Sequence, residues 1–260
     1  MKYSFIWLSL CLFFLQSCLH LNPANDKSSS ETLTADNVVV TFEVEENMFP
    51  DSWYESPIDG NAKSLHPDRY EHSFSIINKA MSKYPKGFLE NYIKKVYVLD
   101  ELNFYGVSYG GTNSDDAVYI VNQGYDMGYT DVYLEQTFHH EFSSILFRNY
   151  PEYFNNREWT KNNKGFTYGS GGVNAIIDGS ASIELSNEYA RMGVLCQYAK
   201  SDIEEDFNTF AEQLFLSSDS FWDMVSSYPA LNNKLKIIVS FYYKINSKFT
   251  EEYFREISKE

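Results

Sequence analysis

The sequence predicts an α+β fold in which a small sheet packs on helices. Segments rich in β-branched and aromatic residues lie mostly before residue 122, whereas helical spacing dominates after residue 134. Blocks of strands followed by blocks of helices are typical of α+β domains and not of alternating parallel folds. The region 37–260 is long enough to bury a sizeable core, so we expect one domain there.

The first half of this domain is expected to hold the strands. They are predicted over 38–44, 95–99 and 117–122. The glycine-containing segment 104–112 is interpreted as either a strand or a loop. A helix is predicted before the second strand, because apolar side chains of the segment 66–84 recur at helical spacing: Tyr70, Phe74, Ile77 and Met81. A short helix is expected over 88–95.

The second half is expected to be mainly helical. Helices are predicted over 134–149, 202–216 and 232–245, and Pro151 ends the first of them. The segment 155–179 contains several glycines and is interpreted as loop-rich.

The N-terminus has the pattern of an export signal. Lys2 precedes the apolar stretch 5–15, which is too short to span a bilayer, since a spanning helix needs about 20 residues. The run Leu15-Gln16-Ser17-Cys18 resembles the lipobox of bacterial lipoproteins. The resemblance implies that residues 1–17 are a signal peptide and that Cys18 is lipidated.

Residues 18–36 are predicted to tether the domain to a membrane. They are rich in Asn, Ser, Thr, Asp and Lys, and a segment with so little apolar content cannot bury enough surface to order itself. We therefore expect a lipid-anchored protein of the cell envelope. Leu19 is not the Asp that marks inner-membrane retention in some bacteria, which favours the outer membrane or the cell surface.

Charge and cysteine content exclude several classes. Asp plus Glu outnumber Lys plus Arg by 36 to 21, for a net charge of −15, which disfavours nucleic acid as a partner. Once Cys11 is removed with the signal and Cys18 carries lipid, Cys196 has no partner for an internal disulfide. Cys196 is expected to be a small buried residue.

The segment around His140 carries the strongest chemical pattern. His140-Glu141 begins the His-Glu-x-x-His motif, in which two His four residues apart on a helix bind zinc and the Glu activates water. Ser144 stands where the second His is required. His139 cannot replace it, because adjacent helical residues point about 100° apart. A His–Glu pair satisfied near the core is the alternative interpretation.

The helix predicted over 202–216 begins with a cluster of acidic residues. Glu205, Asn208 and Glu212 share one face, so this helix could supply a further carboxylate ligand. Phe207 and Phe210 are expected on the other side. A solvated acidic face would produce the same pattern.

Together these segments resemble a family of bacterial lipoproteins described as zinc-binding metallopeptidases and linked with outer-membrane nutrient uptake. The resemblance rests on the segments 139–146, 198–199 and 205–207, on the final helix and on the lipoprotein signal. It implies a zincin-like metallopeptidase fold with an active-site helix. It also implies a zinc ion held by His140 and Glu205, with Glu141 as the catalytic base.

His139, Ser144 and Glu212 would then surround the metal ligands as hydrogen-bond partners. The chain departs from the family pattern, because Ser144 replaces a ligand and the acidic segment is stretched. In the family, the Glu ligand is followed one helical turn later by a second acid. If Glu205 is the ligand, the position of that second acid holds Thr209. If Glu212 is the second acid, the ligand position holds Asn208.

Three functions remain open at this stage. The first is an anchored zinc metallopeptidase that hydrolyses peptide bonds. The second is an inactive binding or accessory lipoprotein of a surface uptake system, which would hold a peptide, a glycan or a partner protein in the former cleft. The third is a structural lipoprotein with no cleft near Glu141. Two protein ligands leave zinc short of the usual three, so zinc affinity should fall, and Ser144 leaves the choice between the first two functions open.

Overall fold

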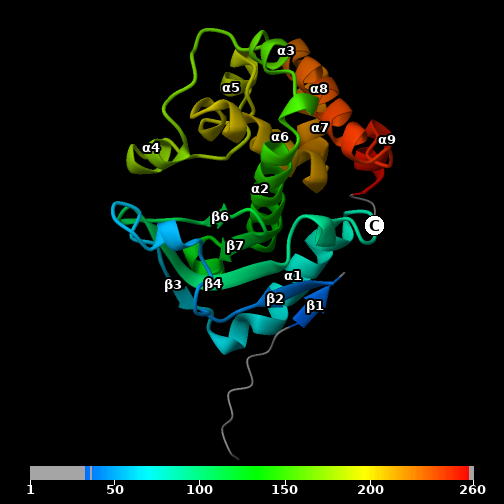
Figure 1. Cartoon of the computed structure of the whole chain (residues 1–260). Coiled ribbons are helices and arrows are strands. Elements are labelled where there is room, and N and C mark those ends of the chain that lie inside the picture. The colour runs from blue at the N-terminus through cyan, green and yellow to red at the C-terminus, as the bar shows by residue number, and fades with distance from the viewer. Residues whose placement is uncertain (1–32, 36, 258–260) are drawn as a thin grey trace, which may run out of the picture.

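A mixed sheet formed by the first half of the chain supports the helices that follow it (Figure 1). The computed structural model describes residues 33–35 and 37–257. The strands are β1 (Leu33–Ala35), β2 (Val38–Thr41), β3 (Asn61–Ser64), β4 (Lys95–Phe104), β5 (Val107–Ser108), β6 (Gly111–Asn113) and β7 (Ala117–Val121). The helices are α1 (Tyr70–Ser82), α2 (Asp131–Asn149), α3 (Asn156–Thr160), α4 (Gly172–Ile177), α5 (Asn187–Met192), α6 (Ile203–Leu216), α7 (Asp219–Ser227), α8 (Pro229–Ile245) and α9 (Glu251–Glu256). The predicted α+β class is confirmed.

The sheet has parallel strands in the middle and antiparallel strands at its edges. Its order is β1-β2-β4-β7-β6, with β2, β4 and β7 parallel, while β1 and β6 run antiparallel to their neighbours. The long strand β4 also pairs with β3 and β5 through its second half. The strand β6 therefore lies at one edge of the sheet, beside the candidate site described below.

Alternate side chains of the central strands enter two separate cores. Val96 and Val98 of β4 point to the face where α1 and α2 pack, and both are fully buried. Tyr97 and its cross-strand neighbour Tyr119 point to the other face, where the segment 45–62 covers them. Because strand side chains alternate with a period of two, one strand can serve both cores.

The helix α2 stands between the sheet and the C-terminal helices (Figure 1). The helix α6 packs along α2, and Phe207, Phe210 and Leu214 of α6 are fully buried. These apolar residues lie on the side predicted for them. Their burial holds α6 against α8 and leaves its acidic face toward α2.

A buried ion pair joins α6 to α8 inside this helical half. The Lys234 ammonium lies 2.5 Å from Asp206 Oδ2, and both side chains are inaccessible to solvent. The same Asp206 oxygen accepts hydrogen bonds from Trp159 Nε1 at 2.8 Å and Tyr168 Oη at 2.6 Å. Burial raises the pKa of Asp206 and lowers the pKa of Lys234, and their mutual attraction opposes both shifts. Asp206 therefore links four segments of the fold: α6, α8, α3 and the loop that contains Tyr168.

Most predicted elements are present, with differences at their ends. The predicted strand 95–99 continues to Phe104, because its second half pairs with β3 and β5. The helix predicted over 134–149 begins earlier, at Asp131, where the Thr130 side chain caps its first turn. The short helix expected over 88–95 is only a single 3₁₀ turn, Leu89–Asn91.

The predicted N-terminal features fall mainly on residues that the structure does not describe. The signal peptide 1–17, the lipidation site Cys18 and most of the tether lie outside the described residues. Leu33–Ala35, which falls within the predicted tether, pairs with β2 as strand β1. Within the part of the chain that the structure describes, no helix is long and apolar enough to cross a membrane. Cys196 is buried, as predicted.

Candidate functional site

The imidazole of His140 lies between two carboxylates that α6 supplies. His140 Nε2 is 2.9 Å from Glu205 Oε2, and His140 Nδ1 is 2.8 Å from Glu212 Oε2. Burial opposes a charge on His140, but the two carboxylates outweigh it and raise the pKa of His140 well above its ordinary value. The structure thus brings together His140, Glu205 and Glu212 from the two predicted helices.

Helix geometry explains why both carboxylates reach one imidazole. Glu205 and Glu212 are seven residues apart, close to two helical turns, so they lie on the same face of α6. Each is held by a second donor. Tyr198 Oη donates to Glu205 Oε1 at 2.8 Å, and Gln136 Nε2 donates to Glu212 Oε1 at 2.5 Å. The carboxylates are therefore positioned by groups outside their own helix.

Glu141 follows His140 in α2 and faces the edge strand β6. Its Oε2 accepts a hydrogen bond of 2.6 Å from Asn113 Nδ2, and burial raises the pKa of Glu141 to about 7. Gly111 permits this close packing, because a Cβ there would lie 2.5 Å from Thr137 Cγ2 and 3.0 Å from Glu141 Oε1. The predicted catalytic carboxylate thus lies beside His140 and against a strand edge.

Ser144 is enclosed in a hydrogen-bond network between α2 and α6. Its hydroxyl donates to Glu204 Oε1 at 2.7 Å and accepts from Asn208 Nδ2 at 2.7 Å. Asn208 Oδ1 in turn accepts from the Ser143 hydroxyl at 2.6 Å, and Arg148 Nη1 donates to Glu204 at 3.2 Å. Ser144, at the position of the missing second His, therefore contacts the neutral amide of Asn208 and the carboxylate of Glu204, which is already paired with Arg148.

This donor set does not fit an ordinary catalytic zinc site. Such a site needs three protein ligands and keeps a further position open for water. His140 Nε2 and Glu205 Oε2 are close enough to share an ion, but Ser144 is a poor ligand and Glu141 is bound by Asn113. Among residues 33–35 and 37–257, no group of three or more His, Cys, Asp or Glu side chains is arranged to hold a metal ion.

His139 lies on the opposite side of α2, away from the other candidate residues. Its ring is fully buried and stacks on Phe215 with centroids 4.8 Å apart, and its Nδ1 is 2.9 Å from Tyr84 Oη. The structure therefore does not bring His139 to its predicted position beside His140 and Glu205. Consecutive helical residues diverge by about 100°, so a neighbour of His140 faces the core instead.

We expect His139 to make the protein less stable in mild acid. Burial lowers the pKa of His139 to about 4, below its ordinary value of 6.5, although Glu135 partly opposes this shift. The unfolded chain then binds the proton more tightly, so stability falls as the pH drops from about 6.5 toward 4. Between pH 7 and pH 5 the free energy of unfolding should fall by about 2 kcal/mol more than in His139→Asn, since each pKa unit is worth about 1.4 kcal/mol.

Urea unfolding of both proteins at several pH values measures this difference. Asn keeps a polar atom for Tyr84 but does not titrate, so it is the matched control. Parallel pH profiles for the two proteins would contradict a neutral, buried His139.

The candidate residues border a pocket of about 470 Å³. Its walls come from β6, α2, α4 and α6, and from the segment 181–183. The wall formed by α4 approaches closely at Gly172, where a Cβ would lie 2.5 Å from Glu205 Oε1. A cleft thus exists beside Glu141, contrary to the purely structural interpretation of the sequence.

Several residues of this pocket had no signal in the sequence. Asn113 lies between the segment 104–112 and the strand predicted over 117–122, and Gln136 precedes the recognised motif. Glu204 appeared only as one member of an acidic run. Tyr198 belonged to the family pattern, but its contact with Glu205 could not be read from spacing.

No family model, curated protein or solved structure matches this chain. The site is therefore interpreted from its own geometry.

Proposed function

We propose that this protein is a non-catalytic, metallopeptidase-like binding protein that holds an extended peptide in the cleft beside β6. The observation that carries the proposal is the closed network around Ser144, combined with the two carboxylates on His140. An ion pair and hydrogen bonds replace the ligands that zinc would need. A zincin-like fold is part of the proposal, supported by α1 and α2 on one face of a sheet with an antiparallel edge strand.

The edge of β6 supports a peptide as the ligand. Val121 N donates to Gly110 O and Ser114 N donates to Ala117 O, which identifies the hydrogen-bonded pairs of the β6–β7 ladder. Since these pairs alternate along an antiparallel ladder, the backbone N–H and C=O of Gly111 and Asn113 point outward. An extended peptide can add to such an edge through main-chain hydrogen bonds.

The charge of the cleft supports a basic peptide. Only two of its charged side chains can be positive, those of His140 and Arg148. Five are acidic: Glu141, Asp202, Glu204, Glu205 and Glu212. Opposite charge steers association and selects partners, so a peptide with Lys, Arg or a free amino terminus is favoured. Anchoring through Cys18 at the outer membrane or cell surface, and service to an uptake complex, stay predictions of the sequence.

A second candidate function is a zinc peptidase with an incomplete ligand set. One observation favours it, because Glu212 contacts His140 Nδ1 as carboxylates commonly contact the free nitrogen of a metal-bound imidazole. In that case His140 and Glu205 would hold the ion and Glu141 would act on water. The test below separates the two candidates.

Peptide binding and hydrolysis should be measured on the same purified protein, with and without added zinc. We expect a basic extended peptide to bind and to remain intact. N-methylation at alternate peptide nitrogens should weaken binding about tenfold for two lost hydrogen bonds, since each contributes about 0.5–1.5 kcal/mol. Methylation at the intervening nitrogens, which would not face β6, is the matched control.

The variant Glu141→Gln keeps an oxygen that can accept from Asn113 and should bind the same peptide. Zinc-dependent cleavage that disappears in Glu141→Gln would contradict the proposal and establish the peptidase.

A further inference from the structure

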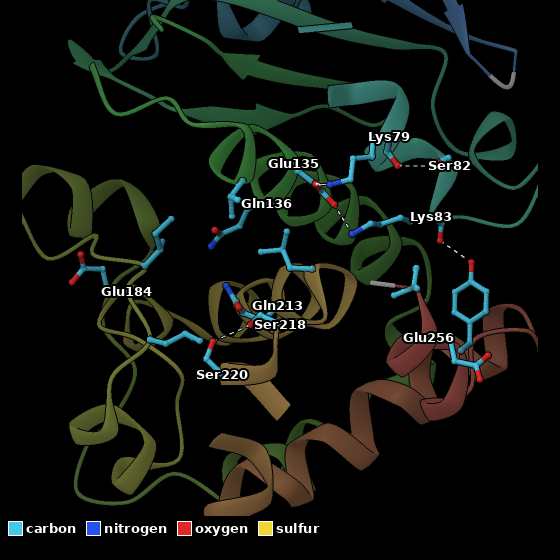
Figure 2. Close-up of a pocket in the computed structure, with 16 residues that line it drawn as sticks. Lys79, Ser82, Lys83, Glu135, Gln136, Glu184, Gln213, Ser218, Ser220 and Glu256 are labelled. Carbon is cyan, nitrogen blue, oxygen red and sulfur yellow. Dashed lines mark hydrogen bonds and ion pairs between the residues drawn. The ribbon is translucent and has the colours of Figure 1, made fainter. Parts of the chain in front are cut away.

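A second and larger pocket lies on the other side of the α2–α6 pair. Its volume is about 820 Å³, and its walls come from the end of α1, the start of α2, the end of α6, and α9 (Figure 2). Neither the sequence patterns nor the proposed peptide cleft accounts for it. We propose that this pocket binds a carboxylate group attached to an apolar body.

The positive charge for such a ligand comes from two lysines that share one acid. Lys79 Nζ lies 2.9 Å from Glu135 Oε2, and Lys83 Nζ lies 2.5 Å from Glu135 Oε1 (Figure 2). Two ammonium groups against one carboxylate leave a surplus of one positive charge at this wall. Interactions with His139, Lys83 and Lys79 outweigh burial and hold the pKa of Glu135 below its ordinary value, so the acid stays ionised.

Of the two ammonium groups, that of Lys83 has the greater effect on a ligand, because Lys79 is 66% exposed. The Lys83 side chain is only 10% exposed, and its ammonium also donates to the Phe215 carbonyl at 2.9 Å. Partial removal from water strengthens its attraction for an anion. Glu184 and Glu256 also line the pocket, but they lie at its edges and are exposed (Figure 2). Water screens exposed charges of this kind more than it screens Lys83.

The remaining walls select the rest of the ligand. Apolar side chains form much of the lining: Val132, Ile183, Leu185, Leu216 and Ile257. Gln136 and Gln213, both nearly buried, provide amide groups beside them. A pocket with apolar walls and a few placed polar groups is the usual form of a small-molecule site. A ligand that carries a branched apolar side chain next to a carboxylate matches this lining.

Two sources could supply that chemistry. Gln136 and Ile183 border both pockets, and Gln136 also donates to Glu212 in the peptide cleft. The carboxylate could therefore be the C-terminus of a peptide or a free small acid. The inference does not depend on the proposed peptide cleft, because the lysine pair would attract either source.

Calorimetric titration with N-acetyl-leucine and with its neutral amide tests the proposal on the full protein. The acid should bind about tenfold more tightly than the amide, because a hydrogen bond to a charged group is about twice as strong as a neutral one. Lys79→Gln should weaken binding of the acid about fivefold and leave binding of the amide unchanged. Lys79 is largely exposed, so this change should not disturb folding.

Lys94→Gln is the matched control. Lys94 is also an exposed lysine paired with one carboxylate, Asp116 at 2.6 Å, but it lies outside the pocket. Equal affinities for acid and amide in both N-acetyl-leucine and the Leu-ending peptides, or equal effects of Lys79→Gln and Lys94→Gln, would overturn the proposal. Peptides ending in Leu, as acids and as amides, identify the source. A preference seen only in the peptide acid assigns the site to a chain end, and a preference already present in N-acetyl-leucine assigns it to a free acid.

Discussion

Ser144→His is expected to convert the candidate site into a zinc site. The introduced imidazole lies one helical turn after His140, on the face that meets Glu205, so three protein ligands become available. Zinc affinity should rise by at least ~100-fold. Loss of a residue that only supports a ligand can already weaken a metal site by that factor, and here a ligand itself is added. Competition with a chromophoric chelator at neutral pH measures the change. The native protein should bind zinc weakly and below one equivalent.

Two further variants separate ligation from a change in folding. Ser144→Ala removes the hydroxyl bonds to Glu204 and Asn208 without adding a ligand, so it should not increase zinc affinity. Combining Ser144→His with Glu205→Gln removes one intended ligand and should abolish most of the gain. Tight stoichiometric zinc binding by the native protein would show that our interpretation of Ser144 is wrong.

Lys234→Met should cause the largest loss of stability. It leaves Asp206 charged, fully buried and without its cation, and breaking a buried pair in this way costs about 3–5 kcal/mol. The melting temperature should fall by about 6–20 °C, since a domain of this size loses about 2–4 °C per kcal/mol. Urea and thermal unfolding, followed by circular dichroism, measure both quantities.

The double variant Lys234→Met with Asp206→Asn should recover most of that loss. The Asn oxygen can still accept from Trp159 and Tyr168, while the uncompensated charge is gone. Lys94→Met breaks an exposed pair and is the control, with an expected cost of about 0–1 kcal/mol. A Lys234→Met protein as stable as the Lys94→Met protein would contradict burial of the Lys234–Asp206 pair.

Local geometry made part of the candidate site predictable. A helix places residues seven apart on one face, so Glu205 and Glu212 could be assigned to a common surface before any fold was known. The same geometry shows that His139 cannot share the face of His140, and the structure places it in the core. Strand and helix blocks also indicated the α+β class, because periodicity reports which faces are apolar.

Contacts between distant segments were beyond this kind of reasoning. Periodicity cannot say which two helices meet, and only the packing of α6 on α2 puts Glu205 and Glu212 on the two nitrogens of His140. The same packing decides the partners of Ser144. It also decides how far β4 extends, since β3 and β5 must be in place to pair with it.

His140, Glu141 and Ser144 were therefore recognisable from the chain, because one helix sets their spacing. Their chemistry depends on groups that the fold brings from elsewhere: Asn113 from β6, and Glu204 and Asn208 from α6. Hydrogen bonds of about 3 Å require positions that no local spacing specifies. For that reason the motif, with Ser144 at the position of the second His, is a property of the sequence, whereas the partners of His140, Glu141 and Ser144 are decided by the tertiary structure.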